Sequence, residues 1–176
     1  MAKKLVGVLQ GSNKNLENLM NAVSYMQDNY VLVGIPQKTS SRPEDKKGSR
    51  EITNAELLYI HTNGSPVNNI PARPVIEPAI YNDSERLSKM LMKGFQRLCD
   101  GDVEKCDRTL QLIGTRAQKV CRDWFTNPAN GWPPNSPGVI AAKLRKGSTA
   151  PKPLIDTGEL RKSITYVIVK DGVRQE

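Results

Sequence analysis

The chain has 176 residues, and its 26 Lys and Arg against 18 Asp and Glu give a formal net charge of +8. No apolar run approaches the roughly 20 residues that span a bilayer, and the first ten residues hold too short an apolar run for a secretory signal, so we expect a soluble protein made in the cytosol. The three cysteines form no Cys-x-x-Cys pair and there is one histidine, a pattern that disfavours zinc sites and disulfide frameworks. We expect no cofactor and no metal.

An amphipathic helix is predicted over residues 13–29. Its apolar residues recur at alternating spacings of three and four, which places them in one stripe, and they are Leu16, Leu19, Val23, Met26 and Tyr30. Ser12 or Asn13 can cap its start, and Asn29 can end it. The β-branched run at residues 30–36 predicts a strand that ends at Pro36. One face of this strand holds Val31, Val33 and Ile35.

Residues 37–50 contain no hydrophobic side chain, and we expect them to form a mobile basic loop. Its cations are Lys38, Arg42, Lys46, Lys47 and Arg50. Thr53 and Glu56 have the spacing of a capping box, so a short helix is predicted to begin there and to stop at Gly64. Four prolines between residues 65 and 78 predict an extended segment, because proline supplies no N–H to a helix interior or a central strand.

Two further helices are predicted, over residues 83–99 and 102–125. The second has the most regular periodicity in the chain, and its apolar positions are Val103, Cys106, Leu110, Ile113, Ala117, Val120 and Trp124. That pattern favours packing on neighbouring helices over an autonomous coiled coil.

The C-terminal part begins with a stretch that lacks acidic residues and is rich in proline, and we expect residues 127–153 to form an extended basic arm. Asp156 is predicted to cap a helical turn, with Glu159 in the reciprocal position of a capping box. Residues 163–170 predict a strand, and Asp171-Gly172 can turn it into a short hairpin.

Groups suited to catalysis are scarce. His61, the single histidine, lies at a predicted helix end, where a structural role is favoured over catalysis. The sequence has no phosphate-cradling glycine pattern, no serine-nucleophile elbow and no metal-binding His-Glu helix, so we do not expect an enzyme. The basic loop and arm could contact phosphates, which leaves a free cytosolic nucleic-acid-binding protein as an alternative, although such cations also occur on ordinary solvated surfaces.

Three segments carry a more specific pattern. Residues 55–80 hold a predicted helix, Gly-Ser, and then Ile-Pro-Ala-Arg-Pro; residues 132–136 are Trp-Pro-Pro-Asn-Ser; and residues 153–164 are Pro-Leu-Ile-Asp-Thr-Gly-Glu-Leu-Arg-Lys-Ser-Ile. In this order they resemble motifs of the tailed-phage virion morphogenesis proteins, which include neck, tail-completion and minor tail protein Z-like members. Val75 is a departure, since the family often has Phe at that position.

The resemblance implies a non-enzymatic structural virion protein, made in the host bacterial cytoplasm, that forms a cyclic ring in the neck or at the head-proximal end of the tail. Such a ring helps to join tail to head and lets DNA pass. The implied partners are further copies of the chain, an adjacent neck or connector ring, tail terminator or tail tube proteins and, transiently, double-stranded DNA, with no membrane.

The implied fold is a single α+β domain over residues 1–176, with a small antiparallel sheet packed against two or three helices and long extended Pro-rich loops or arms. Arg73 would offer its planar guanidinium to a neighbouring subunit. The residues expected at subunit or ring interfaces are Ile70, Pro71, Arg73, Pro74, Trp132, Asp156 and Thr157. The residues expected to contact DNA or an adjoining ring are Lys38, Arg42, Lys46, Lys47, Arg50, Lys143, Arg145 and Lys146.

Overall fold

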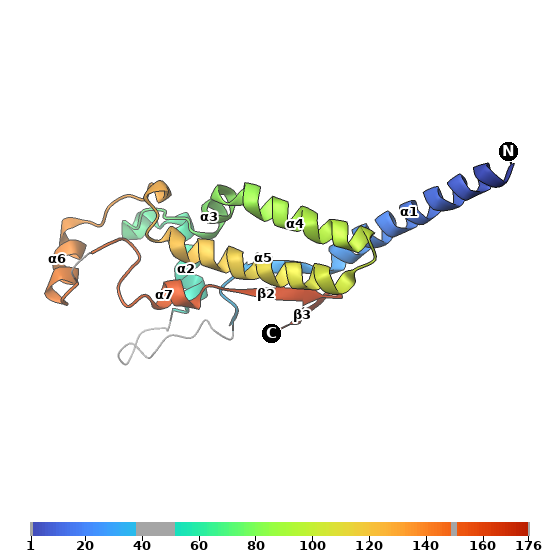
Figure 1. The fold of residues 1–176 in the computed structure, drawn as a ribbon. Helices are drawn as coiled ribbons and strands as arrows, with labels where there is room; N and C mark the ends of the chain where they lie inside the picture. The colour runs from blue at the N-terminus through green and yellow to red at the C-terminus, as the bar shows by residue number, and fades with distance from the viewer. Residues whose placement is uncertain (1, 38–51, 149–150, 176) are drawn as a thin grey trace. The chain divides into compact units, whose positions relative to one another are not determined.

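The chain adopts an α+β fold, seen in a computed structural model that describes residues 2–37, 52–148 and 151–175, with side chains described from residue 13 onward. Within these ranges, seven α-helices accompany a small antiparallel sheet of strand order β1-β2-β3 (Figure 1). The predicted fold class is therefore confirmed. The five cations of the basic loop, Lys38, Arg42, Lys46, Lys47 and Arg50, lie outside the described residues.

The chain divides into two compact units. Unit 1 consists of Met1–Leu32, Ser84–Arg116 and Val167–Glu176, and unit 2 consists of Val33–Asp83 and Ala117–Tyr166.

Unit 1 is built from helix α1 (Ala2–Asp28), which packs on α4 (Ser84–Cys99), and from the first part of α5 (Val103–Trp124). Its buried core is small and comprises Ala22, Leu98, Cys106 and Leu110. Gly94 on α4 faces α5, and a Cβ at this position would lie 3.3 Å from Cγ2 of Thr109. A glycine thus lets the two helices approach closely.

A β-hairpin completes unit 1. Strands β2 (Thr165–Lys170) and β3 (Val173–Gln175) pair antiparallel, with Lys170 opposite Val173. The connecting Asp171 and Gly172 have φ of 51° and 74°, as a two-residue turn of type I′ requires. The predicted hairpin is confirmed.

Unit 2 contains four α-helices: α2 (Asn54–Asn63), α3 (Ile76–Asn82), α6 (Pro137–Arg145) and α7 (Glu159–Ser163), together with the end of α5. Two short 3-10 turns accompany them, Pro66–Asn68 and Pro128–Asn130. Helix α2 packs against α7. The buried core joins these elements and comprises Leu58, Val75, Ala79, Cys121, Trp124, Phe125, Leu160 and Ile164.

Strand β1 (Tyr30–Gly34) and helix α2 match the sequence-based expectations closely. Val31 packs on the core of unit 1, whereas Val33 packs on the core of unit 2. At the start of α2, Oγ1 of Thr53 accepts from the Glu56 N–H at 3.2 Å, and the Glu56 carboxylate accepts from the Thr53 N–H at 2.9 Å. The predicted capping box is confirmed, and so is the stop at Gly64, which has a φ of 74°.

The predicted start of the first helix is wrong. Helix α1 begins at Ala2, so Ser12 and Asn13 lie in its interior and cap nothing. Good helix formers such as Lys, Leu and Gln occupy much of the first ten positions, and they outweigh the cost of the two interior glycines, Gly7 and Gly11.

Two segments predicted as extended contain helices. Helix α3 begins at Ile76 and places Pro78 in its first turn, where an N–H has no intrahelical partner and proline is therefore tolerated. Helix α6 lies within the predicted arm at residues 127–153: the Ser136 hydroxyl accepts from the Val139 N–H at 3.5 Å, and Pro137 occupies the first turn. Serine followed by proline is a helix start that the proline count alone concealed.

The predicted role of Asp156 as a helix cap is also wrong. Gly158, with φ of 80°, occupies the N-cap of α7, and no side chain caps that helix. The Thr157 hydroxyl instead accepts a hydrogen bond from the Glu159 N–H at 3.4 Å. The left-handed backbone at Gly158 separates Asp156 from the helix start.

Candidate functional site

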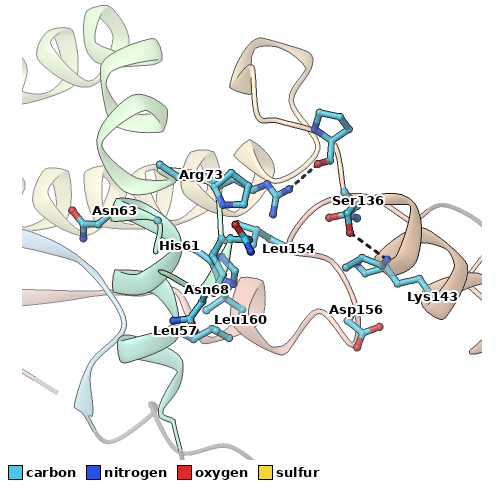
Figure 2. A pocket seen from close by; sticks show the side chains of 18 of the residues that line it. Leu57, His61, Asn63, Asn68, Arg73, Ser136, Lys143, Leu154, Asp156 and Leu160 are labelled. Carbon is cyan, nitrogen blue, oxygen red and sulfur yellow. Dashed lines mark hydrogen bonds between the residues drawn. The ribbon is translucent and has the colours of Figure 1, made fainter. Parts of the chain in front are cut away.

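An open groove of about 1480 Å³ lies in unit 2, and all three segments of the sequence motif line it (Figure 2). One wall is helix α2 and the chain that follows it as far as Arg73. The opposite wall comes from residues 134–136, from Val139 and Lys143 on α6 and from Lys146 after it, and the remainder comes from residues 154 and 156–160. Segments that lie far apart in the sequence therefore meet at one place.

Arg73 holds two of these walls together. Its side chain is only 6% exposed, and Nη2 donates to the carbonyl oxygens of Pro133 at 2.9 Å and Pro134 at 3.0 Å, while Nε donates to Pro133 at 3.2 Å. The dashed line at Arg73 in Figure 2 marks such a bond. Burial lowers the pKa of the guanidinium from its ordinary value. Nε and Nη2 of this planar fork thus bond carbonyls of its own chain, and the expectation that Arg73 serves a neighbouring subunit stays a prediction.

Trp132 adds a second link between the same two segments. Its indole N–H donates to the Pro74 carbonyl at 3.0 Å, and its ring meets Phe125 edge to face, with centroids 5.7 Å apart and an interplanar angle of 87°. Pro74 and Trp132, both expected at an interface, therefore act as internal supports. Each motif donates hydrogen bonds to proline carbonyls of the other: Arg73 donates to the Trp-Pro segment, and Trp132 donates to the segment that holds Arg73.

The third motif is joined to α6 through a lysine. Lys143 donates to the carbonyl oxygens of Lys152, at 2.8 Å, and Ile155. Burial lowers the pKa of Lys143. Lys146 lies 3.8 Å from the Asp156 carboxylate, a contact that exposed groups make at little gain in stability. Of the three basic residues predicted here, Lys143 and Lys146 line the groove, whereas Arg145 is exposed on α6 and is not among the lining residues.

The other predicted interface residues divide in the same way. Ile70 and Pro71 line the groove on the α2 side, and Asp156 and Thr157 line it on the opposite side. The backbone at Ile70 is held by a bridge to Ser65, in which the Ser65 N–H donates to the Ile70 carbonyl at 2.8 Å. These four residues are the part of the predicted interface that faces open space.

Two polar atoms of helix α2 beside the groove have no hydrogen-bond partner among the described residues. They are Oδ1 of Asn54, a residue only 4% exposed, and Nδ1 of His61. Burial, and then the positive charge of Arg73, lower the pKa of His61, so the imidazole is neutral at pH 7. The sequence offered no signal for Asn54, which follows the capping threonine like any helix residue.

The groove offers shape and hydrogen bonds more than reactive groups. Within the described part of the chain, no carboxylate bonds Nδ1 of His61, whereas the general base of a catalytic dyad is oriented by such a third group. Among the described residues, no cluster of three or more His, Cys, Asp or Glu side chains could hold a metal ion. The arrangement is suited to docking an extended chain segment against walls that are already ordered.

Comparisons with known proteins add no relative. No protein-family model matches the chain, and neither the curated proteins nor the solved structures that were compared contain a match. None of the helices in the described ranges is both long enough and apolar enough to cross a bilayer.

Proposed function

We propose that the chain is a structural, non-enzymatic virion protein of a tailed bacteriophage, a ring-forming subunit of the neck or the head-proximal end of the tail that helps to join tail to head and lets DNA pass. The observation that supports this proposal is the convergence of the three motif segments on one groove. Arg73 and Trp132 lock the first two segments to each other over about 60 positions of sequence, so the motifs form one structural unit.

A groove of this kind fits a subunit that binds its neighbour head to tail. In a cyclic ring each subunit presents one surface to the next subunit and a different surface to the previous one. The proline-rich walls lose little conformational entropy when a neighbour docks, since their backbone is already ordered. Ile70, Pro71, Asp156 and Thr157 would contact the docked segment, and Arg73, Pro74 and Trp132 would hold the walls in place.

The proposal is tested on particles of the phage that encodes the chain. Cryo-electron microscopy without imposed symmetry at the neck should show a ring between portal and tail tube whose subunits fit this chain. Absence of the chain from purified particles would refute the proposal. Salt-dependent DNA binding by the free protein, combined with that absence, would favour the nucleic-acid-binding alternative.

A matched pair of variants tests the groove itself. Val139 lines the groove and is 44% exposed, whereas Val67 is 93% exposed and is not among the lining residues. Val139→Asp is expected to leave heads and tails unjoined in a complementation assay, because a charge would enter the docking surface, and Val67→Asp is expected to assemble normally. Normal joining with Val139→Asp would contradict docking in this groove.

A further inference from the structure

Helix α1 turns a mixed face toward the rest of unit 1: Ala22 is buried in the core, Tyr25 and Met26 pack on it, and polar groups lie beside them. Asn18 Nδ2 donates to the Cys99 carbonyl at 3.2 Å, and the Tyr25 hydroxyl donates to the Asp107 carboxylate. Asn29, which follows the helix and is 2% exposed, accepts from the Asp171 N–H at 3.2 Å. These specific bonds set the rotation of α1 about its axis.

The other face of α1 is apolar and exposed. The exposed fractions of its side chains are 56% for Leu16, 44% for Leu19, 65% for Met20 and 46% for Val23. These positions follow the i, i+3, i+4, i+7 spacing of a single helical stripe. Helix α1 thus carries an exposed apolar stripe in addition to the apolar contact that Ala22 and Met26 make with the core, whereas a helix on the surface of a monomer is expected to expose a polar face.

The apolar stripe has the features of a coiled-coil seam. Leu16, Leu19 and Val23 occupy alternating a and d positions of a heptad. In the sequence the same spacing continues upstream through Leu5 and Leu9, with a polar residue, Ser12, at one position. Downstream the exposed seam ends at Val23, because Met26 packs on the core of unit 1. The flanking e and g positions between Asn13 and Gln27 that lie outside the core are Asn13, Asn15, Met20 and Gln27, none of which is charged, and the remaining one, Ala22, is buried in the core of unit 1.

These features identify the partner as a second copy of the chain. A heptad seam packs its side chains into the holes of another heptad seam, and uncharged flanks let two identical helices meet without like-charge repulsion. The other seam of this spacing, on α5, is used within the chain, where Cys106, Leu110, Ala117 and Trp124 are buried. No other helix in the described ranges exposes four large apolar side chains at this spacing.

We propose that α1 of one copy packs against α1 of a second copy through Leu16, Leu19, Met20 and Val23. This pairing goes beyond the ring proposed above and does not depend on it, because the seam lies in unit 1 and the groove lies in unit 2. Pairing would bury the apolar stripe that the chain leaves exposed by itself.

The test is the molar mass of the purified full chain, measured by light scattering and sedimentation over a concentration series that reaches the high micromolar range. The wild-type chain is expected to be a dimer or a multiple of it. The double variant Leu16→Asp/Leu19→Asp is expected to raise the dissociation constant of the α1 pair by more than about 100-fold, because four leucines per pair lose an apolar environment.

A matched control uses α5. Leu112 lies in unit 1 and is 61% exposed, close to the value for Leu16, so Leu112→Asp introduces an equivalent charge away from the seam. This control should associate like the wild type, and circular dichroism should show that both variants keep their helix content. A monomeric wild-type chain, or association that Leu16→Asp/Leu19→Asp leaves unchanged, would overturn the proposal. Equal dissociation by Leu112→Asp would overturn it as well.

Discussion

Replacement of Arg73 tests how the candidate site is held together. Its guanidinium donates three hydrogen bonds to the carbonyls of Pro133 and Pro134, at 2.9 to 3.2 Å, and its side chain is 6% exposed. Arg73→Ala removes these bonds, and water can reach the freed carbonyls because Pro133 and Pro134 are exposed, so the loss is that of the hydrogen bonds themselves. A hydrogen bond to a charged group contributes about 1.5 to 3 kcal/mol, and we expect unit 2 to lose about 3 kcal/mol of unfolding free energy, the low end of that range for the two carbonyls together.

A lysine at the same position separates charge from geometry. Arg73→Lys keeps the positive charge, but its single ammonium group cannot reproduce the planar fork that bonds two successive carbonyls. The expected loss is about half that of the alanine variant, roughly 1.5 kcal/mol. Arg145→Ala is the control, since Arg145 is exposed on α6, and its effect should stay within about 0.5 kcal/mol.

The assay is urea unfolding followed by tryptophan emission. Both tryptophans of the chain, Trp124 and Trp132, belong to unit 2, so their emission reports this unit directly. A loss below about 1 kcal/mol for Arg73→Ala would refute the idea that Arg73 locks the two segments, because it would place the cost below that of a single hydrogen bond to a charged group. Equal stability of Arg73→Lys and the wild type would refute the role of the planar fork.

Three further predictions concern single groups. Burial and the charge of Arg73 lower the pKa of His61, so the imidazole resonance of this single histidine should titrate by NMR below about 6.5. The unfolding free energy should fall as the pH drops below that value, and it should fall less in His61→Gln. A titration above 6.5 would contradict this. Gly64→Ala should lower the free energy of unfolding by more than about 2 kcal/mol in thermal or urea unfolding, because a Cβ there would lie 2.8 Å from the Ala72 backbone nitrogen. The control is Gly147→Ala, which has φ of 84° and nothing within 4 Å of the added Cβ, and it should lose only about 1 kcal/mol through backbone strain. Similar losses in the two variants would contradict the steric explanation. Burial raises the pKa of the Cys121 thiol to about 12, so a thiol reagent at pH 8 should label Cys121 only after denaturation. Peptide mapping separates it from the partly exposed Cys99, and rapid labelling of Cys121 itself in the native chain would show that the core of unit 2 is open.

The sequence alone determined the helix ends and turns that depend on interactions between neighbouring residues. The capping box of Thr53 and Glu56, the stop at Gly64 and the turn at Asp171-Gly172 each depend on residues within a few positions of one another, and all were predicted. The long helices α4 and α5 were predicted within one residue at either end, because their apolar periodicity extends over several turns.

The predictions that failed have two kinds of cause, one in the neighbouring residues and one in contacts between residues far apart in the sequence. The start of α6 was missed because proline was taken as a helix breaker, although it is well tolerated in a first turn next to a serine cap. The partner of Arg73 could not be predicted, since a guanidinium bonds the carbonyls of its own chain or of a neighbour with equal chemistry. Only the folded chain brings Pro133 and Pro134, some 60 positions away, to within 3.2 Å of it.

Helix α1 shows the same division. Its sequence determined that Leu16, Leu19 and Val23 share one face, because the helical period leaves no other arrangement. Only the tertiary structure decided that this face points away from unit 1, because the bonds of Asn18, Tyr25 and Asn29 to distant parts of the chain favour the opposite rotation. Periodicity defines a face, but contacts between residues far apart in the sequence decide what that face meets.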